Sequence, residues 1–222
     1  MKQQTEKLRD RNGLTEEEFL AQYNPGNYPR PSMTVDMLIF AAPGLMPSQE
    51  AGSGFPDIRF LTDGTLKLLL IRRGGHPCLG QYALPGGFVG PDETVAEAAR
   101  RELFEETHAQ NIPLRQLYTF SKPGRDPRTW VMSCAHLAVL NTDTIPVKAG
   151  DDADKAEWFT VSVSMKEPLY RIVLSNDSVV LEAYIACPPQ FDEGSCCIQK
   201  NNGLAFDHGT MILCGLKSLF GI

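Results

Sequence analysis

The chain has 222 residues, of which 42% are hydrophobic, so it can bury the core of one domain with additions. Its net charge of −6 argues against a broad nucleic-acid-binding surface, which needs clustered Lys and Arg side chains. We expect no membrane-spanning helix, because no apolar run reaches about 18 residues, and no secretory signal, because the first residues are polar and charged.

Residues 1–31 are expected to form an N-terminal arm. Thr15, followed by three glutamates and then Phe19 and Leu20, predicts a short capped helix. Asn24-Pro25-Gly26 and the prolines that follow would end that helix. The arm would precede a single domain over residues 32–222.

The rest of the chain alternates strand-like and loop-like stretches. Strands are predicted at residues 33–41, 57–61, 65–73, 115–120 and 129–140, and one more follows the polar stretch 147–157. Thr62-Asp63-Gly64 indicates a hairpin between the second and third of these. Residues 74–93 are loop-rich, and an inserted hairpin spans about 168–186, turning near Asn176. Residues 187–203 look irregular, and residues 204–220 have near-helical apolar spacing. Strands mixed with few helices indicate an α/β or α+β sandwich.

Six cysteines are present, and no two of them have C-x-x-C spacing. Cys196-Cys197 with Cys187 upstream leaves a soft-metal site open. The alternative is that all six are reduced thiols of a cytoplasmic protein, and this is the interpretation that we adopt.

A carboxylate-rich helix follows the double glycine in LPGGFVGPDETVAEAARRELFEET, residues 84–107. Thr94, with Glu97 three residues later, forms a capping box, so the helix is predicted over residues 95–107. Glu102, Glu105 and Glu106 fall on the same half of the helix as its apolar residues.

Three carboxylates on the inner half of a helix are costly to bury unless they are paired, and they also repel one another. A hard divalent cation such as Mg²⁺ resolves both problems, because it prefers oxygen ligands and often joins carboxylates to phosphates. The alternative is a solvated Arg/Glu face, since Arg101 and Glu105 form an i,i+4 pair. The adjacent Gly86-Gly87, which allows close backbone approach to a ligand, favours the metal site.

The stretch resembles the Nudix box, G-x5-E-x7-R-E-U-x-E-E-x-G-U. The matching residues are Gly87, Glu93, Arg101, Glu102, Leu103, Glu105 and Glu106. Two positions depart from the pattern, because His108 replaces a glycine and Ala109 stands at a bulky apolar place. That glycine ends the helix, commonly with positive φ. Since His tolerates such a backbone at some cost, we expect slightly lower local stability and intact chemistry.

The resemblance implies an α/β/α sandwich with a mixed sheet and a loop–helix–loop catalytic motif. It further implies Mg²⁺, or alternatively Mn²⁺, and hydrolysis of a nucleoside diphosphate linked to another group. Carried over position by position, the metal ligands would be Glu102, Glu105, Glu106 and the Gly86 carbonyl. Arg101 would orient a glutamate, so Arg101, Glu102 and Glu105 are candidate catalytic residues.

Several other stretches resemble the ADP-ribose pyrophosphatase-like branch of the family, among them GQYALPGGFV, AGDDADKAEWF and LAFDH. The segment GRDPR, residues 124–128, favours this branch most. The resemblance therefore implies hydrolysis of ADP-ribose to AMP and ribose 5-phosphate by a homodimer that has a small nucleotide substrate and no nucleic-acid or membrane partner.

Two further loops are candidates to complete the site. Asp152 is the candidate base or extra ligand, with Asp151 the close alternative and a solvated acidic turn the non-functional one. Arg125 and Arg128 can contact phosphate or ribose, although a turn ion pair with Asp126 explains them equally well. Strand alternation predicts that only one of Arg72 and Arg73 faces the phosphates, and Arg73 is our candidate.

Aromatic side chains near the site can stack on a base. Phe88 is the candidate, with Tyr28 and Tyr82 as alternatives, although packing explains each as well. We expect His76 to be a loop residue and His208 to pack or cap the last helix.

Two alternatives to this activity stay open. The chain could be a pyrophosphatase of another nucleotide conjugate, or a sensor of ADP-ribose-like ligands. Related transcriptional regulators continue past an LAFDH-like helix into a DNA-binding domain, for which the stretch up to Ile222 leaves no room. Those regulators often have altered boxes, whereas the three box glutamates here are intact. We therefore expect an enzyme.

Overall fold

The computed structural model describes residues 8–43, 66–143 and 153–222. The chain divides into two compact units, Met1–Arg30 and Pro31–Ile222. The first unit contains the helix α1 (Glu16–Gln22), which begins at a capping box between Thr15 and Glu18, and a short 3-10 turn at Pro25–Asn27. The capped helix predicted after Thr15 is therefore confirmed.

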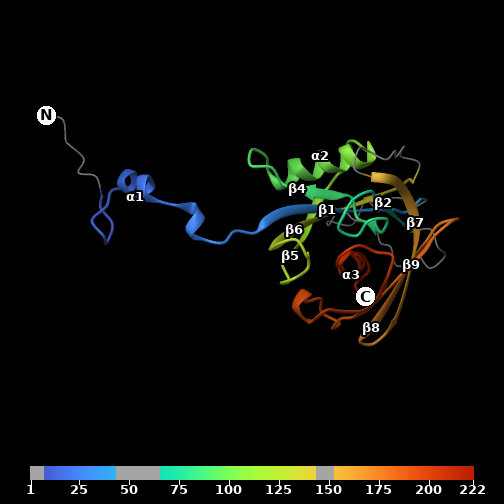
Figure 1. The fold of residues 1–222 in the computed structure, drawn as a ribbon. Coiled ribbons are helices and arrows are strands. Elements are labelled where there is room, and N and C mark those ends of the chain that lie inside the picture. The colour runs from blue at the N-terminus through green and yellow to red at the C-terminus, as the bar shows by residue number, and fades with distance from the viewer. Residues whose placement is uncertain (1–7, 44–65, 144–152) are drawn as a thin grey trace, which may run out of the picture. The chain divides into compact units, whose positions relative to one another are not determined.

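The second unit is built on one mixed β-sheet (Figure 1). The bounds of its strands are β1 Ser32–Ala41, β2 Lys67–Arg73, β3 Tyr82–Ala83, β4 Gly86–Phe88, β5 Arg115–Phe120, β6 Val131–Leu140, β7 Ala153–Lys166, β8 Leu169–Ser175, β9 Val180–Ala186 and β10 Cys197–Asn202. The order across the sheet is β10-β9-β8-β7-β2-β1-β6-β5, with β3 paired to β2 and β4 paired to β1. Strand β1 runs parallel to β6 and antiparallel to β2, which makes the sheet mixed.

Two helices cover opposite faces of β1, namely α2 (Val95–Thr107) and α3 (His208–Phe220). Successive side chains of a strand point to opposite faces of a sheet. Val35, Met37 and Ile39 accordingly share a buried cluster with the apolar residues of α2. Leu38 and Phe40 belong to the larger cluster that includes α3. The predicted α/β/α sandwich with a mixed sheet is confirmed, and Figure 1 shows β1 between the two helices.

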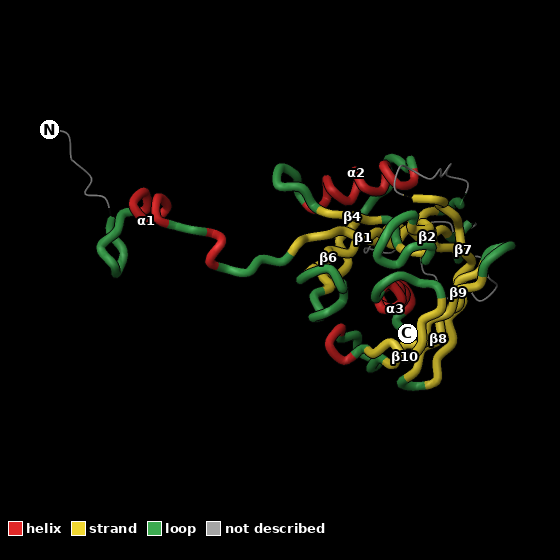
Figure 2. The backbone as a smooth tube through the Cα atoms, in the orientation of Figure 1, coloured by secondary structure: helices red, strands yellow, loops and turns green. Residues whose placement is uncertain are grey.

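The hairpin of β8 and β9 extends the sheet around α3, as the tube in Figure 2 shows. Its inward-facing residues, such as Tyr170 and Ile172, are buried in the same cluster as α3. At the turn, the Asn176 side chain accepts hydrogen bonds from the backbone of Ser178 and Val179. The hairpin and its turn lie where the sequence predicts them.

Two stretches that we expected to be irregular contain strands. The loop-rich region 74–93 includes β3 and β4, and the region 187–203 includes β10 and a 3-10 turn at Glu193–Ser195. Strands β3 and β10 pair with the strands that precede them, whereas β4 pairs with β1, which lies much earlier in the sequence. The strand predicted at 57–61 and the Thr62-Asp63-Gly64 hairpin lie outside the described residues.

The expectation that all six cysteines are reduced is wrong for one pair. Cys187 and Cys196 form a disulfide across Cα atoms 4.4 Å apart, within the usual range for such bonds. Cys197 is exposed and free. In the residues described, no group of His, Cys, Asp and Glu could hold a metal ion, so the soft-metal alternative finds no support. The same residues include no helix long and apolar enough to cross a membrane.

Candidate active site

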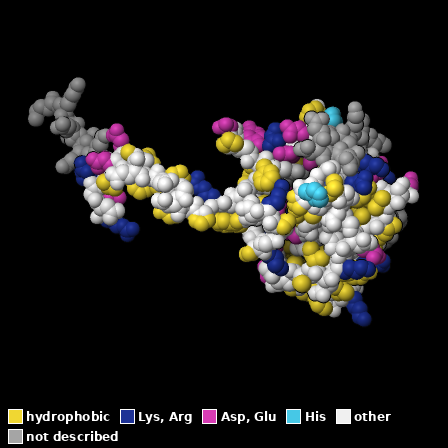
Figure 3. All heavy atoms as spheres, viewed as in Figure 1, with side chains coloured by type: hydrophobic (Ala, Val, Ile, Leu, Met, Phe, Trp, Pro, Cys, Tyr) yellow, Lys and Arg dark blue, Asp and Glu magenta, His cyan; other side chains and the backbone are white. Residues whose placement is uncertain are grey.

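The helix α2 begins and ends as its sequence dictates. The Thr94 hydroxyl accepts a hydrogen bond from the Glu97 backbone, and the Glu97 carboxylate accepts one from the Thr94 backbone. At its other end, His108 has a left-handed conformation with φ of 59°. The expectation of positive φ at this position is therefore confirmed. Figure 3 shows acidic side chains gathered over this helix.

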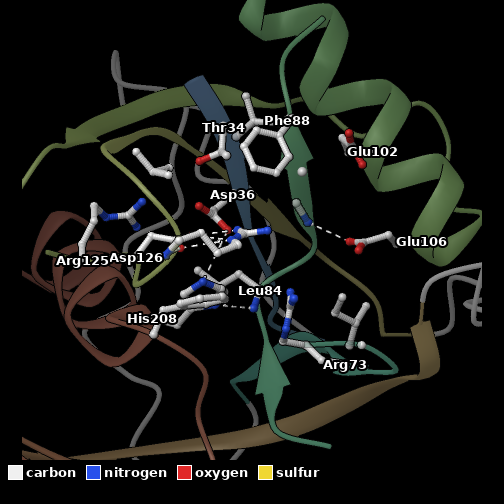
Figure 4. A pocket seen from close by; sticks show the side chains of 18 of the residues that line it. Thr34, Asp36, Arg73, Leu84, Phe88, Glu102, Glu106, Arg125, Asp126 and His208 are labelled. Atoms are coloured by element: carbon white, nitrogen blue, oxygen red, sulfur yellow. Dashed lines mark hydrogen bonds and ion pairs between the residues drawn. The ribbon is translucent and has the colours of Figure 1, made fainter. Parts of the chain in front are cut away.

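The two glycines of β4 let the carboxylates of α2 approach the strand closely. A Cβ atom at Gly87 would lie 2.3–2.4 Å from the carboxylate atoms of Glu102, so no larger residue fits without moving that carboxylate. The Gly86 backbone N–H donates a hydrogen bond of 2.7 Å to Glu106 Oε2, drawn as a dashed line in Figure 4. This glycine pair therefore sets where Glu102 and Glu106 lie.

Arg101 joins the acidic side chains that surround it. Its guanidinium donates to Glu93 Oε2 at 3.0 Å, to Glu102 Oε1 at 2.8 Å and to Glu105 Oε2 at 2.9 Å. It also donates to the Phe88 carbonyl at 3.0 Å. These hydrogen bonds, above all that from Glu93, raise the pKa of Arg101. Arg101 consequently binds three glutamates of the motif at once.

A cavity of about 570 Å³ opens beside this helix, in the size range of small-molecule sites. Carboxylates line one part of it, and arginines line another (Figure 4). Its lining includes Asp36, Gly86, Gly87, Glu102, Glu106, Arg73, Arg125, Asp126, Arg128, Phe88, Phe206 and His208. The arrangement places anionic and cationic groups around one hollow, which suits a ligand that carries phosphates and is held through a cation.

Arg125 and Arg128 both line the cavity, and each has an acidic partner. Arg125 makes two hydrogen bonds to Asp207, at 2.9 and 2.8 Å, and its side chain is only 6% exposed. Arg128 pairs with Asp126 at 2.7 Å, the turn ion pair that was the alternative explanation for it. Pairing with a carboxylate does not exclude a role in binding, since a guanidinium has five N–H donors.

Aromatic rings also hold two of the arginines in place. The Arg73 guanidinium carbon lies 5.1 Å from the centre of the Phe206 ring, and that of Arg128 lies 5.1 Å from the centre of the Phe88 ring. Such cation–π contacts fix a guanidinium without using all of its donors. Arg73 lines the cavity, whereas Arg72 donates to the Gly80 carbonyl, in agreement with the predicted alternation.

A row of buried, interacting polar side chains forms the floor of the cavity. Asp36, on β1, accepts a hydrogen bond from the Ser133 hydroxyl, and its Oδ1 lies 3.5 Å from Nε2 of His208. The other ring nitrogen of His208 accepts a hydrogen bond of 2.8 Å from the Leu84 backbone. Burial lowers the pKa of His208 to about 3, so the ring is neutral, with its proton on the nitrogen that faces Asp36.

The carboxylates at the cavity prefer to be neutral or to meet a cation. Burial raises the pKa of Glu106 to about 8, although its hydrogen bond from Gly86 opposes the change, and the charges of Glu102 and Asp36 raise it further. Burial likewise raises the pKa of Asp36 to about 7 and raises that of Glu102. Removing water from like charges that lie together has this effect.

The donor set fits a hard divalent cation in its chemistry. Carboxylates with raised pKa values and a backbone carbonyl at Gly86 offer only oxygen atoms, which Mg²⁺ and similar ions prefer. In the described residues, however, no group of acidic or metal-binding side chains is close enough to hold an ion. Glu102 and Glu105 are instead bonded to Arg101, so a cation would compete with this guanidinium for them.

The predicted site residues do not all meet in the cavity. Those that line it are Gly86, Glu102, Glu106, Phe88, Arg73, Arg125 and Arg128. Glu105, with its side chain 53% exposed, and Arg101 are not among the lining residues. Asp151 and Asp152 lie outside the described residues.

Tyr82 and Tyr28 are the alternatives to Phe88 for base stacking. Tyr82 is buried, with its hydroxyl bonded to Glu157, so it packs in the core. Tyr28 lies in the first compact unit, whose place relative to the second is not defined. His76 lies in a loop, as predicted, and lines the cavity.

Sequence reasoning missed the floor of the cavity. It took His208 only as a packing or capping residue and did not consider Asp36. His208 is in fact the first residue of α3, and its ring bonds to the cavity wall. Asp36 did give a signal, because it is the one charged residue in the apolar stretch MTVDMLIFA, residues 33–41. A lone carboxylate in a buried strand needs a partner or a function.

Comparison with known families identifies the domain. The sequence model of the NUDIX domain matches residues 58–174, more than half of the chain. A solved structure of a MutT/nudix family protein from Enterococcus faecalis superimposes with a TM-score of 0.66 at 31% identity, over 93% of this chain and 70% of that one. The helix and glycines described above fall within the matched residues.

Two characterised relatives are similar over shorter stretches. The ADPR responsive transcriptional repressor NtrR of Acinetobacter baylyi is 32% identical, over 70% of this chain and 55% of the repressor. The ADP-ribose pyrophosphatase of Methanocaldococcus jannaschii is 45% identical, over 43% of this chain and 56% of that enzyme. The chain thus spans about half the length of these relatives.

Proposed function

The chain belongs to the Nudix family, and we propose that it hydrolyses ADP-ribose to AMP and ribose 5-phosphate with the help of a divalent cation. The observation that carries this proposal is the cavity, which is lined by carboxylates of α2 and β1, by Arg73 at the end of β2, and by Arg125 and Arg128 in the loop between β5 and β6. Similarity to an ADP-ribose pyrophosphatase supports the choice of substrate.

The arginines would bind the diphosphate oxygens. Arg73, Arg125 and Arg128 all line the cavity, and each is already held by an aromatic ring or a carboxylate. A guanidinium fixed before binding loses less conformational entropy when it meets a phosphate, which favours tight and oriented binding. Phe88, 45% exposed at the cavity, offers a face on which adenine can stack.

The carboxylates would hold the cation. Glu102, Glu105 and Glu106, with the Gly86 carbonyl, are the proposed ligands, and Mg²⁺ or Mn²⁺ the proposed ions. The bound ion would neutralise the diphosphate and lower the pKa of the attacking water. Arg101 would keep Glu102 and Glu105 oriented, as its hydrogen bonds to both suggest. Water would attack one phosphorus atom, the bond from that phosphorus to the bridging oxygen would break, and the other phosphate would leave with the bridging oxygen.

Asp152 stays a candidate base, since it lies outside the described residues. A homodimer and a cytoplasmic location likewise stay predictions. Hydrolysis of another nucleotide conjugate, with the same cation and arginines, is the nearest alternative to the proposed substrate.

Ligand sensing is a second candidate function. Similarity to an ADPR responsive repressor over 70% of this chain favours it. A sensor would need the cavity and its arginines, but it would not need carboxylates able to hold a cation. Binding without turnover therefore separates the two functions.

The test is to incubate the purified protein with ADP-ribose and Mg²⁺, and separately with ADP-ribose and EDTA, and to separate the products by chromatography. We expect AMP and ribose 5-phosphate with Mg²⁺ and none with EDTA. Comparison of kcat/KM with NADH, nucleoside triphosphates and sugar nucleotides then ranks the substrates. If all of these stay intact while calorimetry detects ADP-ribose binding, the protein is a sensor.

A further inference from the structure

A buried carboxylate outside the cavity holds the loop that carries Arg125. Glu193, in the 3-10 turn between β9 and β10, is only 6% exposed. It lies beyond residues 58–174, the part of the chain that matches the family model. A buried carboxylate is costly unless it is hydrogen-bonded, so its partners indicate what it does.

The partners of Glu193 are the first two residues after β5. The Ser121 backbone N–H donates to both carboxylate oxygens at 2.9 Å, and the Lys122 backbone N–H donates to Oε1 at 2.7 Å. The Lys122 side chain in turn donates to the Cys196 carbonyl at 2.7 Å. Figure 1 shows this turn close to the loop that joins β5 and β6.

The same loop forms one wall of the cavity. Its residue Arg125 donates its backbone N–H to the Lys122 carbonyl at 3.2 Å, and its side chain reaches the cavity and Asp207. Only Pro123 and Gly124 lie between the backbone that Glu193 binds and Arg125. A displacement of Ser121 and Lys122 would therefore move Arg125 relative to the cavity.

The turn that carries Glu193 is itself restrained. The Cys187–Cys196 disulfide closes the segment of which Glu193 is part, which limits the conformations open to it. The Lys217 side chain donates to the Pro189 carbonyl at 2.9 Å within the same segment. The turn that carries Glu193 is thus fixed to β9 and α3 and is not a free surface loop.

We infer that Glu193 is a positioning residue for substrate binding, through which segment 187–196 keeps the Arg125 loop in place to receive the phosphate groups of the substrate. The inference rests on the proposed function for the identity of the ligand. Segment 187–196, which lies outside the Nudix box, thereby has a role in substrate binding. Glu193 does not touch the reacting atoms and acts only through the backbone of Ser121 and Lys122.

Glu193→Gln is the sharpest test, because it keeps the size of the side chain while replacing one acceptor oxygen by an NH₂ donor. That donor would face a backbone N–H, so at least one hydrogen bond is lost. Loss of a hydrogen bond to a charged group predicts a rise in the KM for ADP-ribose of about tenfold, with kcat within about threefold of wild type. Glu182→Gln is the matched control, since its carboxylate pairs with Arg171 on β8.

Hydrogen exchange measured by mass spectrometry supplies a readout independent of hydrolysis. Glu193→Gln should raise exchange in peptides covering residues 121–130 and leave peptides from α2 unchanged, whereas Glu182→Gln should change neither. Faster exchange together with a higher KM supports the inference. Unchanged exchange, or faster exchange with an unchanged KM, overturns it.

Failure of the proposed function gives a different result. In that case the wild type itself yields no AMP from ADP-ribose under any metal condition. The dissociation constant of ADP-ribose, measured by calorimetry for the wild type and both variants, then replaces KM. A Glu193→Gln protein that binds as tightly as the wild type, or a wild type that does not bind at all, contradicts the inference.

Discussion

His208 accepts a hydrogen bond from the backbone N–H of Leu84 through its Nδ1 atom, at 2.8 Å. A protonated imidazole carries hydrogens on both nitrogens, so it could not accept this bond. The geometry agrees with burial, which lowers the pKa of His208 to about 3. The bond links the start of α3 to the strand region that leads into Gly86 and thus to the cavity.

The neutral His208 predicts a pH-dependent stability. The unfolded chain takes up a proton as the pH falls below 6.5, whereas the folded ring does so only near a pKa of about 3. The contribution is therefore complete above pH 6.5 and is lost as the pH falls towards 3. His208→Asn, whose amide oxygen can accept from Leu84, removes this titration. The wild-type advantage over this variant should shrink by roughly 2–3 kcal/mol between pH 7.5 and 4.5.

Urea denaturation of both proteins at the two pH values measures that difference. Comparison of the two proteins cancels titrating groups that lie far from residue 208. A gap in the free energy of unfolding that stays constant over this range would mean that His208 is not held neutral.

Replacing each of the two glycines of β4 by alanine should have a different effect, on stability at Gly86 and on activity at Gly87. A Cβ atom at Gly86 would lie 2.2 Å from the Val35 carbonyl oxygen, a backbone atom that cannot move freely. Gly86→Ala should therefore lower the free energy of unfolding by about 1–3 kcal/mol. At Gly87 the added atom meets the Glu102 carboxylate, the end of a flexible side chain. Gly87→Ala should keep the fold and reduce kcat by about 100-fold, because the carboxylate is displaced.

Thermal unfolding and steady-state kinetics on the same preparations distinguish these two effects. Wild-type activity of Gly87→Ala, or wild-type stability of Gly86→Ala, would contradict these effects.

Arg101→Lys should impair catalysis without unfolding the protein. A lysine cannot reproduce the fork that bonds Glu93, Glu102 and Glu105 together. The loss of orientation should lower kcat by about 10–100-fold with little change in KM. Arg100→Lys, the same change at the exposed neighbouring position, is the control and should keep wild-type kinetics. Equal activity of the two variants would argue against a role for Arg101 in orienting the glutamates.

His108→Gly should stabilise the protein. The backbone φ of 59° at the end of α2 strains a side-chain-bearing residue, and glycine adopts it freely. We expect a gain of about 1 kcal/mol in the free energy of unfolding, with unchanged kcat/KM. A loss of stability would show that the contact of the His108 ring with Phe104, at 5.5 Å between ring centres, outweighs the strain.

The parts of the fold that the sequence predicted are those determined by nearby residues. The bounds of α2 follow from the Thr94–Glu97 capping box and from its apolar spacing. The β8–β9 turn follows from Asn176, whose side chain bonds to the next residues of the chain. Both depend on interactions within a few positions, which a sequence displays directly.

The parts that the sequence did not predict depend on distant partners. Strand β4 has three residues and exists because it pairs with β1, which lies much earlier in the sequence. The contact between Asp36 and His208 joins residues far apart in the sequence. Glu193 likewise accepts hydrogen bonds from backbone more than 70 positions away. No local pattern encodes such contacts.

The most direct test of the account compares Glu106→Gln with Glu97→Gln on ADP-ribose and Mg²⁺. Glu106 lines the cavity and accepts from Gly86, a bond that the Gln oxygen can keep. Glu97 is exposed on the same helix and belongs to its capping box, where Gln also fits. We expect the wild type and Glu97→Gln to form AMP and ribose 5-phosphate, and Glu106→Gln to be slower by at least about 100-fold. Equal rates for both variants, or no products from the wild type, would contradict a metal-dependent hydrolase at this site.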